Sequence, residues 1–133
     1  MGHRIISQNR GRGGPRYRAP SHRYKAELKH LGQAGKTISY RIIDIEHDPA
    51  RHTPIALVDV PGGENAYVLV TEGLGIGDTL TWGSEAEIRN GNTLPLEEIP
   101  TGFSVCNIEA YPNDGGKFVR ASGVQATVTD KLD

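Results

Sequence analysis

The sequence predicts an all-β protein in which a small antiparallel barrel follows a basic N-terminal segment. Glycine and proline supply 17 and 8 of the 133 residues, which is typical of short strands joined by many turns. Apolar residues make up only 36% of the chain and the mean hydropathy is -0.46, so the expected core is small. No stretch approaches the roughly 18 apolar residues of a membrane span and none is typical of a signal peptide, so we expect a soluble intracellular protein.

Charge is divided unevenly along the chain. Residues 1–30 carry eight basic residues and one acidic residue, a net charge of +7, whereas residues 31–133 carry 7 basic and 15 acidic residues, a net charge of -8. Six of the eight early cations are arginine, which binds phosphate through two parallel hydrogen bonds and stacks on bases. This asymmetry favours RNA as the partner of the first segment.

The first segment, residues 1–36, is expected to be disordered without a partner, because its glycines and prolines interrupt helices and strands. Tyr17 and Tyr24 lie among the arginines, so bases can stack on the rings while guanidinium groups follow the phosphates. The alternative is a basic tail with no specific target. The residues of this segment expected to contact RNA are cations, stacking rings and one imidazole: Arg4, Arg10, Arg12, Arg16, Tyr17, Arg18, His22, Arg23, Tyr24, Lys25 and Lys29.

A short helix is expected at the end of this segment. Ser21 can cap it, Tyr24, Leu28 and Leu31 would share one face, and Gly32 would end it. The apolar face is narrow, so this helix would need RNA or the following domain to stabilise it.

Residues 37–89 are expected to form the barrel. Its predicted strands are rich in β-branched residues and are followed by turn signals: residues 37–45, 54–60, 66–71 and 79–82. The loop at residues 62–65 is predicted to join the second and third strands as a hairpin. Four strands joined by short turns are typical of a small barrel of the oligonucleotide-binding (OB) type.

Residues 90–133 follow as a connector and further strands, expected at residues 103–110 and 123–129. Two or three strands are too few for an independent barrel. The turn at residues 113–116, with Lys117 and Arg120 after it, predicts a second RNA contact, because consecutive glycines let backbone amides approach a phosphate. The alternative is an ordinary hairpin turn with two exposed cations.

Catalytic and metal sites are not predicted. The glycine loop at residues 73–77 lacks the spacing and the helix of a dinucleotide-binding motif. His47, Asp48 and His52 have no fourth ligand nearby for a closed zinc site. Cys106 is the single cysteine, which excludes an internal disulfide, and we expect it to be a small buried residue of a strand.

Five motifs, in order, closely resemble the archaeal form of the ribosomal protein L-two family of the large subunit. They are RAPSHRYKA at residues 18–26, DIEHDPAR at 44–51, GNTLPLEEIP at 91–100, VCNIE at 105–109 and DGGKFVRASG at 114–123. The resemblance implies a non-enzymatic, primary rRNA-binding protein of the cytoplasmic ribosome that supports assembly, subunit association and tRNA binding. Its implied partners are large-subunit rRNA and neighbouring ribosomal proteins, with neither a membrane nor a small-molecule substrate.

The resemblance also implies a fold and further contacts. An OB barrel would be followed by an SH3-like barrel, of which this sequence holds only the N-terminal strands, because it ends at Asp133 before the family's C-terminal part. RNA contact is implied for His47 and Arg51, and again for Lys117 and Arg120. No cofactor is implied apart from magnesium ions that rRNA can contribute as bridges. Because the C-terminal part is absent, the resemblance assigns this chain no role at the peptidyl transferase centre.

Two other functions stay open at this point. One is a free oligonucleotide-binding translation or assembly factor that cycles on and off ribosomes. The other is a small enzyme that uses either Cys106 or the group of His47, Asp48 and His52.

Overall fold

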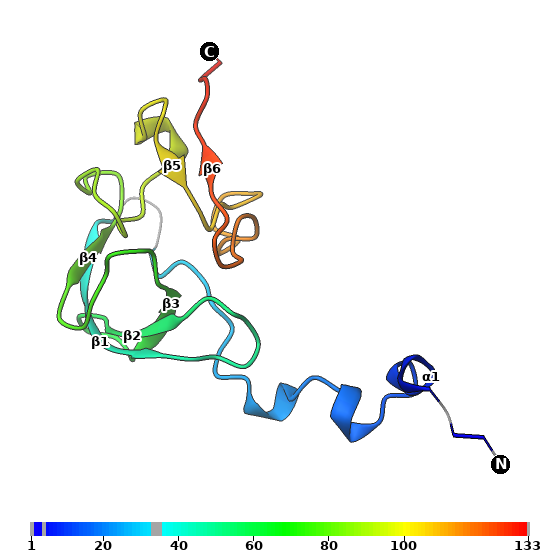
Figure 1. The fold of residues 1–133 in the computed structure, drawn as a ribbon. Coiled ribbons are helices and arrows are strands. Elements are labelled where there is room, and N and C mark those ends of the chain that lie inside the picture. The colour runs from blue at the N-terminus through cyan, green and yellow to red at the C-terminus, as the bar shows by residue number, and fades with distance from the viewer. Residues whose placement is uncertain (1, 4, 33–35, 133) are drawn as a thin grey trace.

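The computed structural model describes residues 2–3, 5–32 and 36–132. Its centre is a four-stranded antiparallel sheet with the order β3-β2-β1-β4 (Figure 1). The strands are β1 Ile38–Glu46, β2 Ile55–Asp59, β3 Ala66–Leu69 and β4 Thr79–Trp82. All four predicted strands and the predicted β2–β3 hairpin are confirmed. None of the helices in the described residues combines the length and the apolar character that a bilayer crossing requires.

A bulge in β1 curves this sheet. The first half of β1 pairs with β4, from Ile38 opposite Trp82, and the second half pairs with β2, ending with Glu46 opposite Ile55. The register shifts between Ile42 and Asp44, and the alternation of buried and exposed residues along β1 breaks there, because Ile43 and Asp44 are both exposed. Because an extra residue bends a strand and increases its twist, the sheet curls into a half-barrel. This confirms the expected OB-type architecture.

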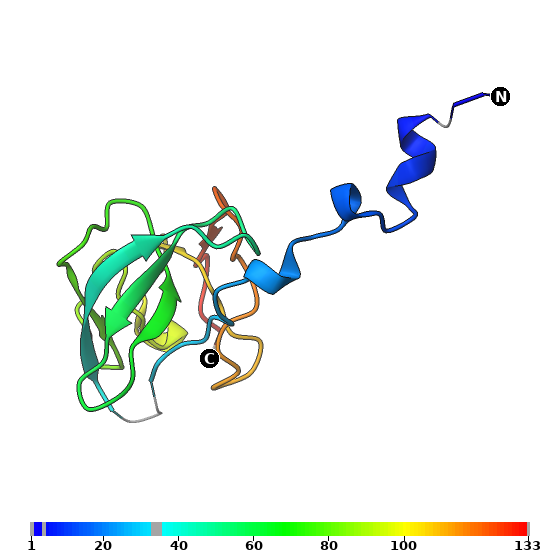
Figure 2. The same cartoon turned by 90° about the horizontal axis from the view of Figure 1, so that it is seen from below.

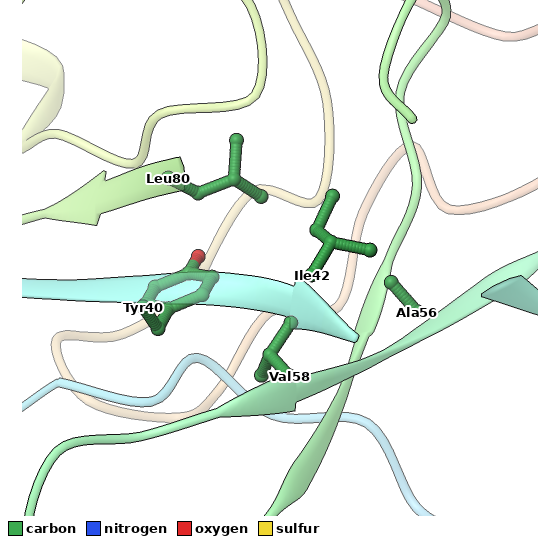
Figure 3. Packing of buried hydrophobic residues seen from close by; sticks show 5 residues of the cluster. All are labelled: Tyr40, Ile42, Ala56, Val58 and Leu80. Carbon is green, nitrogen blue, oxygen red and sulfur yellow. The ribbon is translucent and has the colours of Figure 1, made fainter. Parts of the chain in front are cut away.

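The core lies inside the curl (Figure 3). Alternate side chains of β1 and β2 point to the same face of the sheet, and β4 adds one more. The buried cluster consists of Tyr40, Ile42, Ala56, Val58 and Leu80. Partly buried side chains such as Leu31, Val68 and Trp82 pack against it. This small core sits where the sequence predicts the barrel.

The N-terminal segment leads away from the half-barrel (Figure 2). It contains α1 Ile6–Arg10 and two 3-10 turns, Pro15–Tyr17 and Ser21–Arg23, none of which has a buried residue. The structure therefore gives local helices to a segment for which disorder is predicted. They are too short to be stable without a partner.

The helix predicted after Ser21 is wrong beyond Arg23, because the chain is non-helical from Tyr24. Leu28 is only 3% exposed. The carbonyls of Ala26 and Leu28 accept hydrogen bonds from arginine side chains of other parts of the chain. Tertiary contacts have thus taken the place of the hydrogen bonds that a helix would make.

The last part of the chain, residues 101–132, has little regular structure. The ladder of β5 Ser104–Val105 with β6 Ala126–Thr127 replaces the two longer strands predicted there. None of its described apolar side chains belongs to the buried core, and five are 47% to 93% exposed: Phe103, Tyr111, Phe118, Val124 and Leu132. Without a local core, strand pairing stays short.

Candidate nucleic-acid interface

The projecting N-terminal segment carries the largest group of accessible cations. Five arginines of this segment are exposed and form no ion pair within the described residues: Arg10, Arg12, Arg16, Arg18 and Arg23. Tyr17 and Tyr24 are 37% and 44% exposed, and His22 is exposed as well. Arg4 lies outside the described residues. This segment therefore presents guanidinium groups and stacking rings to solvent.

Two lysines of the predicted interface, Lys25 and Lys29, have exposed side chains and form ion pairs with glutamates. Lys25 Nζ lies 3.1 Å from Glu46 Oε2, and Lys29 Nζ lies 3.5 Å from Glu27 Oε2. The Glu46 partner raises the pKa of Lys25 through a hydrogen bond and its charge. Because exposed ion pairs contribute little to stability, both lysines can exchange these carboxylates for phosphate.

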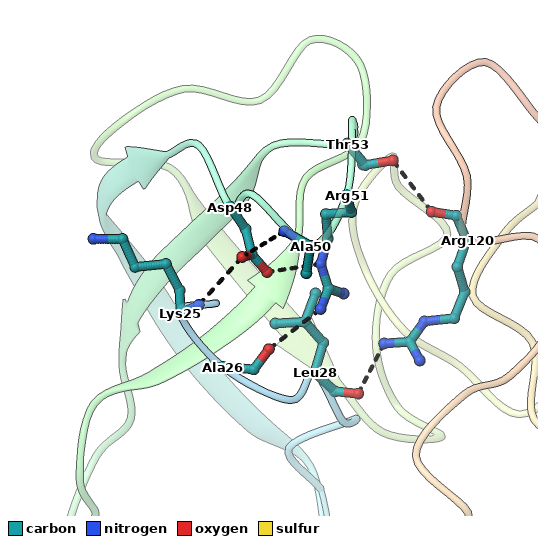
Figure 4. Close-up of polar contacts among 8 residues, drawn as sticks. All are labelled: Lys25, Ala26, Leu28, Asp48, Ala50, Arg51, Thr53 and Arg120. Carbon is teal, nitrogen blue, oxygen red and sulfur yellow. Dashed lines mark hydrogen bonds and ion pairs between the residues drawn. The ribbon is translucent and has the colours of Figure 1, made fainter. Parts of the chain in front are cut away.

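Residues 24–31, which we call the strap, connect this segment to the barrel (Figure 4). The Lys25 amide donates a hydrogen bond of 3.2 Å to Asp48 Oδ1. Arg51 Nη2 donates a hydrogen bond of 3.2 Å to the carbonyl of Ala26. Two residues of the loop after β1 thus hold the first half of the strap.

Asp48 is the charged centre of this loop and is fully buried. Its Oδ2 atom lies 2.9 Å from Arg51 Nε, and its Oδ1 atom accepts a further hydrogen bond of 3.1 Å from the amide of Ala50. Burial disfavours the carboxylate charge, but the hydrogen bonds from Ala50, Lys25 and Arg51 outweigh it and lower the pKa of Asp48. Asp48 therefore acts in the fold as the partner of Arg51.

The neighbouring histidines do not turn this loop into a metal site. His47 and His52 are exposed, whereas the Asp48 carboxylate is directed inward. Within residues 2–3, 5–32 and 36–132, no three histidine, cysteine or acidic side chains are grouped to hold a metal ion. Cys106, predicted to be buried in a strand, is exposed, because β5 ends one residue before it.

Arg120, from the last part of the chain, holds the second half of the strap (Figure 4). Its Nη2 atom donates a 2.8 Å hydrogen bond to the carbonyl of Leu28, and Nη1 donates one of 3.2 Å to the carbonyl of Gly116. Thr53 Oγ1 donates to the Arg120 carbonyl at 3.2 Å, which connects this residue to the barrel. Burial, followed by the nearby charge of Arg51, lowers the pKa of Arg120.

His30 adds a further contact between the strap and the last part of the chain. Its amide donates a 3.2 Å hydrogen bond to the carbonyl of Gly115. Its Nε2 atom lies 2.8 Å from the carbonyl oxygen of Asn107. The strap is therefore bonded to segments on both sides.

The glycine turn after residue 112 differs from the phosphate-binding arrangement that we predicted. The Gly115 amide donates to Glu109 Oε1 at 3.0 Å, and the Gly116 amide donates to Asp114 Oδ1 at 3.1 Å. Burial opposes the charge of Asp114, but amides of the turn and the nearby Lys117 lower its pKa. The protein's own carboxylates use these amides, and the 57% exposed Lys117 side chain is the accessible cation of the turn.

Sequence reasoning missed the strap contacts. The hydrogen-bond acceptors are backbone carbonyls, which every residue has, so the sequence does not indicate which of them accept a hydrogen bond. One signal was present, because Asp48 and Arg51 are three residues apart on a tight turn, a spacing that suits an ion pair. Arg51 and Arg120, predicted RNA contacts, are the residues that this cluster brings together.

Comparison with known proteins gives two family matches. The family model described as "Ribosomal Proteins L2, RNA binding N-terminal domain" matches residues 3–82, and "Ribosomal Proteins L2, C-terminal domain" matches residues 89–133. The "Large ribosomal subunit protein uL2" of Methanospirillum hungatei is 85% identical over 133 residues, 100% of this chain and 56% of that protein.

Proteins of the same name from two other archaea are also similar. The one from Methanoregula boonei is 67% identical over 132 residues, which are 99% of this chain and 56% of that protein. The one from Archaeoglobus fulgidus is 53% identical over 131 residues, 98% of this chain and 55% of that protein. The chain thus spans about half the length of the curated relatives it matches.

Proposed function

Because the chain belongs to the ribosomal protein L2 family, we propose that it is a structural constituent of the large ribosomal subunit and binds the RNA of that subunit. The proposal includes neighbouring ribosomal proteins as partners, a place on the cytoplasmic ribosome, and support of subunit assembly and association, tRNA binding and translation. It assigns the chain no catalytic activity. The proposal includes no cofactor other than magnesium ions that bridge the protein to rRNA phosphates.

One observation carries this proposal, namely five exposed arginines, unpaired within the part of the chain that the structure describes, on a segment that projects from an acidic body. Residues 37–89 hold three basic and nine acidic residues, so the half-barrel has a net charge of -6. Phosphates are therefore attracted to the segment and repelled by most of the body. A division into a basic segment of residues 1–36, a barrel of residues 37–89 and a last part of residues 90–133 belongs to the same proposal.

The remaining proposed contacts surround this segment. Lys25, Lys29 and Lys117 can each exchange a carboxylate for a phosphate, and His47 is exposed beside the strap. Recognition would follow the shape of the RNA, since the major groove of an A-form helix is too deep and narrow for side chains to read. The tyrosines would stack on unpaired bases.

Salt dependence tests the proposal. If about six phosphates are neutralised, the logarithm of the affinity should fall with the logarithm of the salt concentration with a slope of about -4 to -5, since each contact contributes roughly 0.7 to 0.9. Binding of the 133-residue chain to large-subunit rRNA fragments is measured by filter retention between low and high salt. A slope near zero contradicts the proposal.

A matched pair of variants locates the interface. Arg16→Gln removes a cation from the projecting segment, and Arg89→Gln removes an exposed cation from the last residue of the barrel range. We expect the first variant to weaken binding and reduce the slope by roughly 0.7 to 0.9, and the second to change neither. Equal losses in both variants would mean that the segment has no special role.

A ribosome wash separates a permanent constituent from a factor that cycles. An integral protein should stay with large subunits after sedimentation through high salt, whereas a factor should be released. Release would favour the free oligonucleotide-binding factor.

A further inference from the structure

Two cations that the family resemblance connects with RNA are already bound to the protein's own backbone. Arg51 donates a hydrogen bond from Nε to Asp48 Oδ2 and another from Nη2 to the carbonyl of Ala26. Arg120 donates hydrogen bonds from Nη1 to the carbonyl of Gly116 and from Nη2 to the carbonyl of Leu28. Both guanidinium groups therefore hold the strap, Arg51 from the loop after β1 and Arg120 from the last part of the chain (Figure 4).

The strap is the point at which a free chain becomes a fixed one. Before it, the helix and turns of the N-terminal segment contain no buried residue. Within it, Leu28 is 3% exposed and backbone groups of Lys25, Ala26, Leu28 and His30 are hydrogen-bonded to other parts of the chain. The direction in which the arginines leave the body is set here.

We infer that Arg51 and Arg120, with Asp48, are positioning residues for RNA binding, which fix the strap and so the root of the arginine-bearing segment. This inference rests on the proposed rRNA-binding function. It gives the two arginines a different task from that of a phosphate ligand.

The energetics support this assignment. If Arg51 turned to a phosphate, the fully buried Asp48 carboxylate would lose its partner, and an unpaired buried charge is costly. Arg120 would have to leave the Leu28 carbonyl, a buried acceptor of the strap. Neither loss arises when an arginine of the projecting segment binds phosphate.

Fixing the strap strengthens binding without a new contact. If the segment and the body bind one RNA together, a longer flexible connection lowers the effective concentration of the second contact, roughly as the -3/2 power of its length. Release of the strap adds its eight residues, 24–31, to the free chain. Measured from Arg16, this lengthens the free connection about twofold, so we expect its loss to weaken RNA binding by about 3-fold, at every salt concentration.

Substitutions of Arg120 separate the two tasks. Lysine keeps the charge that a phosphate needs but lacks the planar fork that reaches two carbonyls. For a positioning residue, Arg120→Lys and Arg120→Gln should weaken binding equally, leave the salt slope unchanged and expose the strap to trypsin after Lys25 and Lys29. For a phosphate ligand, Arg120→Lys should keep most of the affinity and Arg120→Gln should reduce the slope by roughly 0.7 to 0.9.

Leu28→Ala is the second variant, and it removes no charge at all. Leu28 is outside the cluster of Tyr40, Ile42, Ala56, Val58 and Leu80, so the barrel core should stay folded, as circular dichroism would show. We expect the same loss of affinity and the same tryptic cleavage as in Arg120→Lys. Arg89→Lys, at an exposed cation that the proposal leaves out of the interface, is the control that should bind normally.

The outcomes are distinct. Absence of salt-dependent binding in the unsubstituted chain rejects the proposed function itself. Normal RNA affinity in Leu28→Ala with a cleaved strap overturns the positioning role, and an uncleaved strap in every variant shows that these residues do not fix it. If Arg120→Lys keeps most of the affinity while Arg120→Gln reduces the slope of the salt dependence, Arg120 is a phosphate ligand and not a positioning residue.

Discussion

Replacing Gly116 by alanine is expected to disturb the contact between the strap and the last part of the chain. Gly116 has a φ of 93°, in the region where side chains are strained. A methyl group there would overlap Oδ1 of Asn107 and lie 3.1 Å from His30 Nε2. Asn107 Oδ1 is buried and accepts no hydrogen bond within the described residues, so it can give way only by displacing its surroundings. The side chain at residue 107 or the strap at residue 30 must therefore move.

The magnitude follows from two contributions. A non-glycine residue at positive φ costs about 1–2 kcal/mol. Displacing His30 from the Asn107 carbonyl removes a hydrogen bond with a net value of about 1 kcal/mol. The free energy of unfolding should fall by about 2–3 kcal/mol, which lowers the midpoint of urea unfolding by about 1–2 M for a small protein.

Gly102→Ala is the matched control. Gly102 has a φ of 89°, but no atom lies within 4 Å of an added methyl group. It carries the backbone strain without the overlap, so its loss should be smaller by about 1 kcal/mol. Urea unfolding is followed by circular dichroism, and amide hydrogen exchange at His30 reports the local contact. Equal destabilisation in both variants, or unchanged exchange at His30 in Gly116→Ala, would refute the argument.

Three further predictions concern the core, the glycine that follows the strap, and acid stability. Ile42→Ala should lower the free energy of unfolding by about 2–5 kcal/mol in urea titrations, because the side chain is 1% exposed; a loss under 1 kcal/mol would contradict the packing. Gly32→Ala should shift the emission of Trp82, because the added methyl group would overlap its ring; an unchanged spectrum would contradict that contact. Folding lowers the pKa values of Asp48 and Asp114, so the stability they contribute is complete above about pH 5 and is lost as pH falls through about 4 and below. Unfolding midpoints between pH 7 and pH 3 test this, with Asp48→Asn expected to flatten the dependence.

The half-barrel could be predicted from sequence because each strand has its own local signal. β1 is rich in β-branched residues and ends before the turn at residues 47–49. The proline and the glycines that follow β2 predict a hairpin. The bulge could not be predicted, since Ile42, Ile43 and Ile45 are equally apolar, so that more than one of them could face the core. Pairing with two different strands decides which of them turns outward.

The strap shows where local reasoning fails. The spacing of Tyr24, Leu28 and Leu31 fits a helix, but two arginines distant in sequence bind the carbonyls that the helix would need. Helix propensity is a weak preference that tertiary contacts override. The same distant contacts separate Arg51 and Arg120 from the cations of the projecting segment, although residue type alone makes them equivalent.

The separation of charge along the chain also bears on how the molecule meets its partner. With a net charge of +7 in residues 1–30 and -8 in the rest, the protein is an electric dipole despite a total charge of only -1. In the field of a polyanion such a molecule experiences a torque that turns the cationic end forward before any contact forms. Productive encounters should therefore begin at the arginines, and added salt should slow the association rate as well as weaken the complex.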